Sequence, residues 1–427
     1  MTDSDPQQGS LKSARLLVIG LVSVIVVLGL AVIVLAIGRG GQRPSPQVNV
    51  LANSRDPCVE CHRRATPGIV EQYGHSAMAA ANVTCMDCHR AQQDQPGAIK
   101  HEGYTILGEP TPGTCERCHP KEVAEFDQSR HSLPAYVAYA GSTGLDSAQL
   151  AAYRSIPEGT YQPDLSRNAI FAMEGDSITR FACQTCHAIG KPRVDGSVGD
   201  CTKCHLRHEF SLEQARKPET CNACHIGPDH PQFEIYTESP HGIMYHTNGD
   251  TWNWDAEAGT LTPRDFPAPT CAICHMSGFG NSATTHDVGD RLTWYLFAPI
   301  STRRPSWQDN RTRMQNVCRT CHNEEFVKEF YLRADEATEA VNGLVARSDS
   351  IMAPLKARGL LTPQPFDEPI DFTYFDTWHF YGRTAKFGVW MQGPDYTQWH
   401  GAYELLHNLS KLRKEVKEKL GEAGARR

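Results

Sequence analysis

The sequence predicts a mainly α-helical fold with a high content of irregular coil, and three observations lead to this prediction. All sixteen cysteines fall into eight C-x-x-C pairs, each followed directly by a histidine, and these motifs are spread unevenly over residues 58–322. Residues 324–358 and 405–420 repeat apolar side chains every three or four positions, the spacing of one helix face. Residues 16–38 form an uncharged run of 23 positions, mostly Leu, Val and Ile.

The uncharged run predicts a transmembrane helix. At about 1.5 Å per residue it reaches roughly 35 Å, enough to cross a bilayer. The run is longer than the apolar core of a secretory signal peptide, and no A-x-A-like cleavage site follows it. We therefore expect 1–15 to be a cytoplasmic tail, 16–38 an uncleaved anchor, and the Gly- and Pro-rich residues 39–56 a tether.

The repeated motif C-x-x-C-H is the attachment pattern of c-type haem. Two cysteines at this spacing reach both vinyl groups of one porphyrin, and the adjacent histidine becomes the proximal iron ligand. Structural zinc needs two such pairs or a spaced histidine pair, and neither zinc nor disulfides explain a histidine after every pair. The motifs predict eight covalently attached haems, held by Cys58/Cys61/His62, Cys85/Cys88/His89, Cys115/Cys118/His119, Cys183/Cys186/His187, Cys201/Cys204/His205, Cys221/Cys224/His225, Cys271/Cys274/His275 and Cys318/Cys321/His322.

Such dense attachment predicts a multihaem cytochrome c fold in which the porphyrins form much of the core. Short helices and loops are then expected between the motifs, with little regular sheet. We assign 57–323 to an octahaem-binding catalytic domain. Because c-type haem is attached outside the cytoplasm, this domain is expected to face the periplasm from a single-pass anchor in the inner membrane.

Residues 324–427 are predicted to be long helices that complete the active site and the oligomer interface. Gly421 is a candidate helix stop. The stripes are explained equally well by packing against the protein's own core and by packing onto other subunits. They consist of Val341, Leu344, Val345, Ile351 and Leu355, and of Leu405, Leu409, Leu412, Val416 and Leu420.

Net charge excludes one class of function. The chain has 42 Lys and Arg against 49 Asp and Glu, a formal charge of −7. Basic residues are dispersed, apart from a modest cluster near the end of the chain. There is thus no basic patch to indicate a nucleic-acid partner.

Eleven of the nineteen histidines lie outside the motifs. A haem that only carries electrons is best six-coordinate, whereas one that acts on a small molecule needs an open position. Eleven spare histidines suffice for seven or for eight distal ligands, so counting does not separate an enzyme from an electron conduit. His407 lies among polar residues and is not expected to be a ligand. The distal candidates are His75, His101, His131, His208, His241, His286, His379 and His400.

The segment after the sixth motif carries candidate catalytic groups. Asp229 and His230 follow Cys224 within a few residues, separated from the motif by Gly227 and Pro228. Oxidation of an N–H or O–H substrate releases protons, which a carboxylate beside the iron accepts and an imidazole relays or orients. The alternative is that Asp229 caps a helix and His230 ligates a haem.

On these residues the chain resembles the octahaem hydroxylamine oxidoreductase family. The resemblance rests on eight motifs with a long gap before the fourth, on Gly227-Pro-Asp229-His230-Pro-Gln, and on Gly393-Pro-Asp-Tyr396-Thr-Gln-Trp-His400-Gly. It implies a catalytic fourth haem without a distal protein ligand, Asp229 and His230 above that open face, and seven bis-histidine haems. It also implies a homotrimer in which Tyr396 is crosslinked to the catalytic haem of a neighbouring subunit; otherwise Tyr396 is a buried aromatic beside haem.

The resemblance implies oxidation of a small inorganic nitrogen substrate, hydroxylamine or hydrazine. Electrons would pass to a cytochrome or to a quinone-linked partner. Two other functions stay open at this point: a nitrite or hydroxylamine reductase using the same site, and a non-enzymatic electron conduit.

Overall fold

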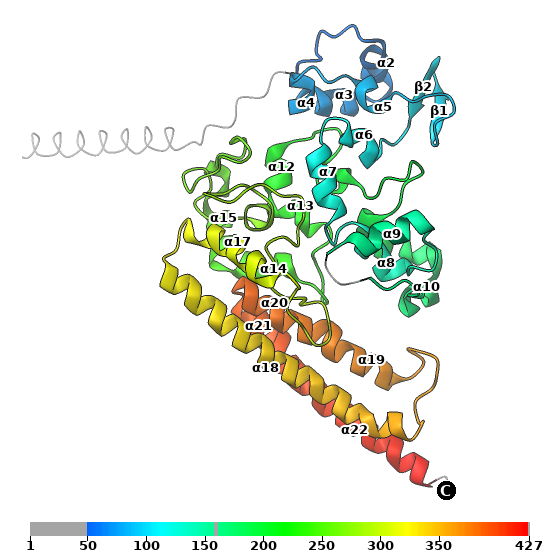
Figure 1. Ribbon diagram of the computed structural model, residues 1–427, viewed down its shortest axis with the longest axis vertical. Coiled ribbons are helices and arrows are strands. Elements are labelled where there is room, and N and C mark those ends of the chain that lie inside the picture. Colours follow the sequence, from blue (N-terminus) through cyan, green and yellow to red (C-terminus); the bar gives the residue numbers. More distant parts are fainter. Residues whose placement is uncertain (1–48, 158–160, 426–427) are drawn as a thin grey trace, which may run out of the picture. The chain divides into compact units, whose positions relative to one another are not determined.

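The computed structural model describes residues 49–157 and 161–425, and within them the chain is mainly helical (Figure 1). The helices are short up to the last motif and long after it. Within this part of the chain, no helix combines the length and the apolar composition needed to span a bilayer. The predicted anchor at 16–38 lies outside the described residues.

The N-terminal elements surround the first three motifs. Asp56 caps the first helix by accepting the backbone N–H of Cys58 at 2.8 Å, and Pro57 favours its start. The elements are α2 (Pro57–Ala65), α3 (Pro67–Gly74), α4 (Ala77–Ala80), α5 (Cys85–His89), β1 (Ala98–His101), β2 (Tyr104–Leu107), α6 (Pro112–Glu116) and α7 (Pro120–Asp127).

The two strands pair as an antiparallel hairpin, the only sheet of the described residues. Its two-residue turn places Glu102 at φ 46° and Gly103 at φ 84°, as a type I′ turn requires. The last pair of the ladder joins His101 to Tyr104, so His101 lies at the tip of the hairpin.

The central region contains motifs four to seven. Its largest apolar cluster is aromatic, with Trp252, Trp254 and Phe266 buried against one another. The elements are α8 (Leu133–Ala140), α9 (Ser147–Ser155), α10 (Ala169–Thr179), α11 (Cys183–His187), η1 (Ala188–Gly190), η2 (Cys201–Lys203), α12 (Leu212–Arg216), α13 (Pro218–Asn222), α14 (Gln232–Glu238), α15 (Pro240–Asn248), η3 (Gly249–Thr251) and α16 (Cys271–His275).

The C-terminal helices begin at the eighth motif. Asn323 caps the longest of them by accepting the N–H of Phe326 at 2.8 Å. Two short segments, η4 and η5, are π-helical, a geometry that is frequent at functional sites. The elements are α17 (Trp307–Arg319), α18 (Glu324–Ala357), α19 (Pro369–Asp376), η4 (Thr377–Gly382), α20 (Arg383–Met391), α21 (Pro394–Thr397), η5 (Gln398–Tyr403) and α22 (Glu404–Ala425).

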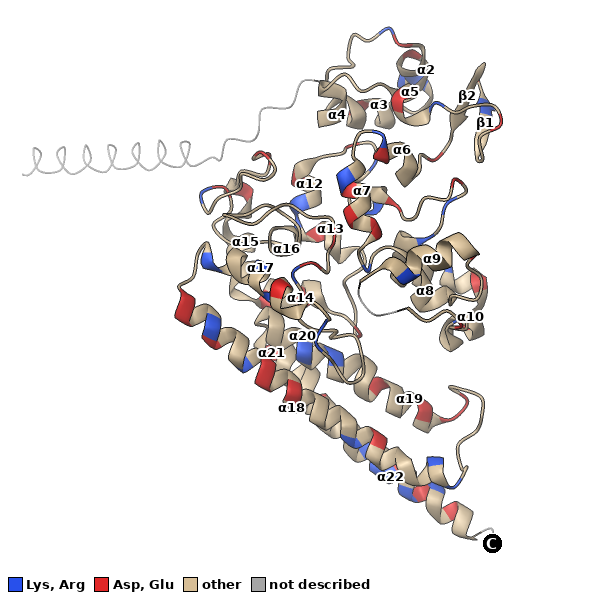
Figure 2. Ribbon diagram, in the orientation of Figure 1, with Lys and Arg blue, Asp and Glu red and all other residues tan. Residues whose placement is uncertain are grey.

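Helices α18 and α22 lie side by side, and the predicted stripes pack between them (Figure 1). Val345 and Leu405 share one buried cluster, and Leu355 and Leu412 share another with α19. The stripes therefore form an internal core, one of the two arrangements that their spacing allowed. Acidic and basic side chains occupy the outer faces in i,i+4 pairs such as Glu329 with Arg333 (Figure 2).

The expected stop at Gly421 is wrong, because α22 continues through it to Ala425. A glycine in an exposed helical position costs only about 1 kcal/mol relative to alanine. The packing of α22 against α18 earlier along the same helix outweighs that cost.

Leu405 and Leu406 offer a matched test of this core, since the first is 0% and the second 50% exposed. We expect Leu405→Ala to lower the free energy of unfolding by about 2–5 kcal/mol, because it leaves a cavity between helices. Leu406→Ala is expected to change it by less than about 0.5 kcal/mol. Guanidinium unfolding followed by circular dichroism checks both values; equal losses would contradict the packing described.

Candidate active site

Three of the C-x-x-C-H motifs fold as single helical turns. Helices α5, α11 and α16 consist of the motif alone, so both cysteines, at i and i+3, lie on one face with the histidine beside them. No disulfide joins any of the sixteen cysteines. In the described part of the chain no three His, Cys, Asp or Glu side chains converge as the ligands of a metal ion would. The structure thus gives no support to the disulfide or zinc alternatives.

Three of the motif cysteines are exposed, namely Cys61, Cys118 and Cys321. The other thirteen are partly buried. On α2 the side chain of Val59 is buried, so Cys61, two residues and about 200° further round the helix, faces solvent. Cys118 follows the end of α6 at Glu116, in an exposed link to the next helix. Haem attachment through Cys61, Cys118 and Cys321 stays a prediction.

Spare histidines lie opposite five of the motif histidines. A metal–nitrogen bond is about 2 Å long, so two imidazoles on one iron have ring centroids roughly 6 Å apart. The observed separations match this value, and the residues fit bis-histidine haem. They are 5.9 Å for His62 and His101, 6.3 Å for His89 and His208, 5.9 Å for His131 and His225, 6.3 Å for His205 and His286, and 6.1 Å for His241 and His322.

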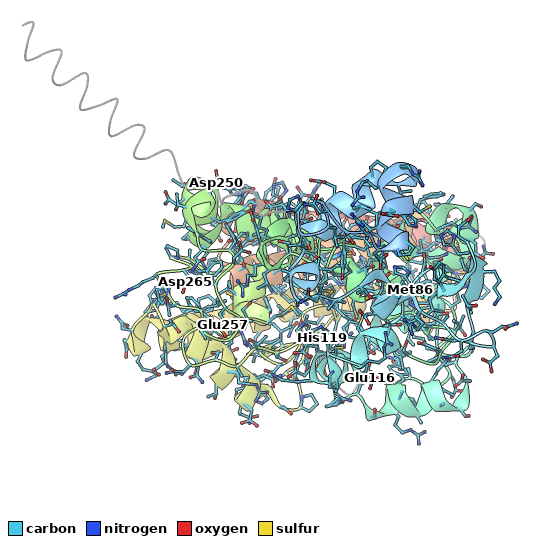
Figure 3. All side chains as sticks on the ribbon, turned by 90° about the horizontal axis from the view of Figure 1, so that it is seen from above. Met86, Glu116, His119, Asp250, Glu257 and Asp265 are labelled. Atoms are coloured by element: carbon cyan, nitrogen blue, oxygen red, sulfur yellow. The ribbon has the colours of Figure 1, made fainter. Side chains whose placement is uncertain are left out.

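The other three motif histidines have no such partner. Among the described residues, no histidine ring contacts His119, which Figure 3 labels near Glu116, nor His187 or His275. His187 has its Nδ1 2.9 Å from the carbonyl oxygen of Ala135, the second contact typical of a proximal ligand.

The remaining spare histidines have other neighbours. Nε2 of His75 lies 3.0 Å from Glu71, and Nε2 of His400 lies 3.0 Å from Asp395. The last three contact side chains close to them in the sequence. The ring of His246 packs on Tyr245 and that of His379 on Phe375, and Nδ1 of His407 lies 3.6 Å from Glu404. Ligation by His75, His379 and His400 stays a prediction.

Contacts between cysteines show which motifs are neighbours. Motif four meets motif six through Cys186 and Cys224. Cys115 also interacts with Cys201, and Cys221 with Cys271, which joins motif three to motif five and motif six to motif seven. Electrostatic effects between Cys58 and Cys85, Cys88 and Cys115, Cys204 and Cys221, and Cys274 and Cys318 indicate that the remaining consecutive motifs lie near one another. Motif four is therefore a branch attached at motif six.

The loop after motif six brings Asp229 and His230 to motif four. Gly227 turns the chain at φ 95°, and its N–H donates to Glu234 at 3.1 Å. The hydroxyl of Thr384 on α20 donates to the Pro228 carbonyl at 3.2 Å. Both loop side chains act electrostatically on Cys186 and His187, although motif four is distant in sequence.

Asp229 and His230 form a close pair. Oδ1 of Asp229 lies 2.6 Å from Nδ1 of His230, and Nε2 of His230 lies 2.9 Å from the Cys224 carbonyl oxygen. Oδ2 of Asp229 is directed to Arg383, 3.9 Å away.

Charge around Asp229 keeps it ionised. Burial alone would raise the pKa of its carboxyl, but the bond to His230 and the neighbouring His379 and Arg383 outweigh burial and lower that pKa. Burial, reinforced by Arg383, lowers the pKa of His379 to about 3, so this imidazole is neutral at pH 7. Nδ1 of His379 is buried without a hydrogen-bond partner.

Three site residues were not found from the sequence: Arg383, Lys386 and Phe297. Arg383 and Lys386 are on α20, and Phe297 lies in a loop, with its ring centroid 6.1 Å from that of His230. Burial, with the charge of Arg383, lowers the pKa of Lys386 to about 7. No motif marks these residues, because they reach the site only through packing of the C-terminal helices.

Tyr396 lies apart from the loop. No hydrogen bond, ion pair or ring contact joins it to Asp229 or His230 among the described residues. Its ring lies 4.9 Å from that of His400. Burial and the nearby carboxylates Glu234 and Glu238 raise the pKa of its hydroxyl.

Comparison with known proteins identifies the family. Residues 81–369 match the family described as "seven times multi-haem cytochrome CxxCH". This range contains the second to the eighth motif.

A curated relative and two solved structures agree with this match. A probable nitrite reductase-hydroxylamine oxidoreductase fusion protein of Kuenenia stuttgartiensis is 29% identical over 271 residues, 58% of this chain. The chain spans only 28% of that relative's length. A hypothetical multiheme protein has a TM-score of 0.72 at 22% identity, covering 87% of this chain and 96% of the other.

The second solved structure is a Kuenenia stuttgartiensis reducing HAO-like protein complex. Its TM-score is 0.65 at 20% identity, over 86% of both chains. At these identities the two structures show the shared fold. The motifs, the fold and the family match together establish that the chain belongs to the multihaem cytochromes of the C-x-x-C-H type, which bind haem c covalently.

Proposed function

We propose that the protein is a membrane-anchored periplasmic octahaem oxidoreductase that oxidises hydroxylamine, or the related hydrazine, at motif four. The observation that carries this proposal is the close pair of Asp229 and His230, which lies against motif six at the Cys224 carbonyl and the His225 ring, where Ala223 of motif six contacts Cys186 of motif four. Among the described residues, no other histidine ring opposes His187. Haem c held by Cys183, Cys186 and His187 would supply an open coordination position and one-electron transfer.

The side chains at the site suit an oxidation that releases protons. Asp229 stays ionised at neutral pH, and its Oδ2, which does not face His230, is available to accept a proton from an N–H or O–H group. Arg383 balances the charge of this carboxylate. His379, neutral and with a free Nδ1, can accept or donate a hydrogen bond to the substrate.

The other seven haems would carry electrons away. We assign the five opposed histidines His101, His131, His208, His241 and His286 as distal ligands. The series of neighbouring motifs supports a continuous route, which motif four joins at motif six. The acceptor would be a cytochrome or a quinone-linked partner.

The location in the cell follows from the attachment chemistry. Covalent haem c is added outside the cytoplasm, which supports a periplasmic domain, and the uncharged run at 16–38 supports a single inner-membrane anchor. A homotrimer, with Tyr396 crosslinked to a neighbouring subunit, completes the proposal.

A reductase working on the same site is the second candidate function. The printed name of the fusion-protein relative includes nitrite reduction, and one of the two solved structures is called reducing. Both candidate functions use the open position at motif four and the side chains of Asp229, His230, Arg383 and His379. They differ in the direction of electron flow.

The distal-ligand assignment predicts a change in spin state on substitution of His131. Removing this ligand opens the iron opposite His225, so His131→Ala should convert one low-spin haem to high-spin. His407, whose side chain is 73% exposed, provides the control, and His407→Ala should leave the spectrum unchanged. Electron paramagnetic resonance of the ferric protein measures both; an unaltered low-spin signal in His131→Ala would refute the assignment.

The role of Asp229 predicts the loss of turnover without loss of haem. Asp229→Asn keeps the size of the side chain but removes the proton acceptor, so hydroxylamine oxidation should fall by at least about 100-fold. Asp309, an exposed carboxylate in the first turn of α17, is the matched control, and Asp309→Asn should retain activity. Pyridine haemochrome assays should show equal haem content, and an active Asp229→Asn protein would exclude the proposed role.

Tyr396 distinguishes oxidation from reduction, because in the resembled family the crosslinking tyrosine accompanies oxidative members. We expect a haem-linked oligomer that survives a denaturing gel and disappears in Tyr396→Phe. Haem staining of the gel provides the measurement. A band at monomer size in the wild-type protein would favour the reductase.

A further inference from the structure

The segment Phe297–Ser301 forms a wall beside the proposed substrate position. The ring of Phe297 lies 6.1 Å from the ring of His230 and packs edge-on against Phe387 at 5.0 Å. The guanidinium of Arg383 lies 5.3 Å from the same ring. Phe297 is 39% exposed.

Two buried polar side chains hold the segment behind this ring. Nζ of Lys386, a fully buried residue without a carboxylate partner, donates to the carbonyl oxygens of Ala298 at 3.1 Å and Pro299 at 3.3 Å. It also donates to Oγ of Ser301 at 2.7 Å. The arrangement uses all three donors of an ammonium group.

Asn342 on α18 clamps the far end of the segment. Its Oδ1 accepts the N–H of Ser301 at 2.8 Å, and its Nδ2 donates to the Ser301 carbonyl at 2.9 Å. Arg383 holds the other end of the segment, because its Nε donates to the Phe297 carbonyl at 2.8 Å. The wall is therefore fixed from two separate helices.

A buried ammonium group costs free energy unless each of its N–H donors is satisfied, so we ask which groups accept hydrogen bonds from Lys386. The acceptors of Lys386 all belong to the wall, and none belongs to the proton-accepting groups. The function of this lysine is thus to set the position of the segment that carries Phe297.

We propose that Lys386 and Asn342 are positioning residues that hold Phe297 over His230, and that the wall so formed restricts the site to molecules of a few atoms. This inference rests on the proposed open position at motif four. It identifies the substrate class as small and unsubstituted, since a larger group would meet the fixed phenyl ring.

The test compares the binding of a small and a bulky iron ligand, cyanide and imidazole, to the whole ferric protein by optical titration. Wild type should bind cyanide and exclude imidazole. Lys386→Met frees the wall, so the affinity for imidazole relative to cyanide should rise by about tenfold or more. Phe297→Ala should show the same change, because it removes the wall itself.

Three further variants make the outcome decisive. Lys411→Met removes an exposed lysine of α22 and should leave the ratio at the wild-type value. Asn342→Asp and Ser301→Ala each remove some of the hydrogen bonds that hold the segment Phe297–Ser301. They test the inference if Lys386→Met loses haem or fails to fold. The inference would be overturned if the affinity for imidazole relative to cyanide stayed unchanged in Phe297→Ala or in any folded variant of Lys386, Asn342 or Ser301.

The same titration separates this inference from the proposed function. Ligand binding requires no turnover, so a protein that shows the size selectivity but does not oxidise hydroxylamine would support the wall and refute the reaction. Binding of neither ligand to wild type would overturn the open position itself, and with it both proposals.

Discussion

The placement of five pairs of histidine rings about 6 Å apart is the constraint on which the proposed haem array depends. Each bis-histidine haem requires a histidine from elsewhere in the chain to arrive about 6 Å, ring to ring, from the motif histidine. The short helices, the β-hairpin and the irregular loops all serve this placement. The hairpin shows it clearly, because its type I′ turn sets His101 opposite His62.

Three motif histidines, His119, His187 and His275, are exceptions to this pairing among the described residues, and His187 is the one that we propose as catalytic. His187 lacks an opposing histidine, and the loop that folds back from motif six places a carboxylate and an imidazole there instead. The C-terminal helices complete the arrangement. Their mutual packing through Leu405 and Leu412 fixes α20, which carries Arg383, Lys386 and Thr384 to the loop and to its wall.

Much of this could be predicted from the sequence, because the attachment chemistry leaves a local pattern. C-x-x-C-H is contiguous, and apolar spacing in the last hundred residues shows where helices form. Distal ligands leave no such pattern: His101 and His75 are equally plausible in the sequence, yet only His101 meets a motif histidine in the structure, while His75 pairs with Glu71. Arg383 and Phe297 could not be predicted, since their proximity arises only from packing between distant segments.

The central claim, an open iron at motif four beside Asp229 and His230, is tested most directly by the optical spectrum of the reduced protein with and without hydroxylamine. A haem with an open position at motif four should be high-spin and change its absorption on addition of hydroxylamine, while the low-spin haems stay unaffected. A fully low-spin spectrum that hydroxylamine leaves unchanged would contradict it, and would indicate a protein that only conducts electrons.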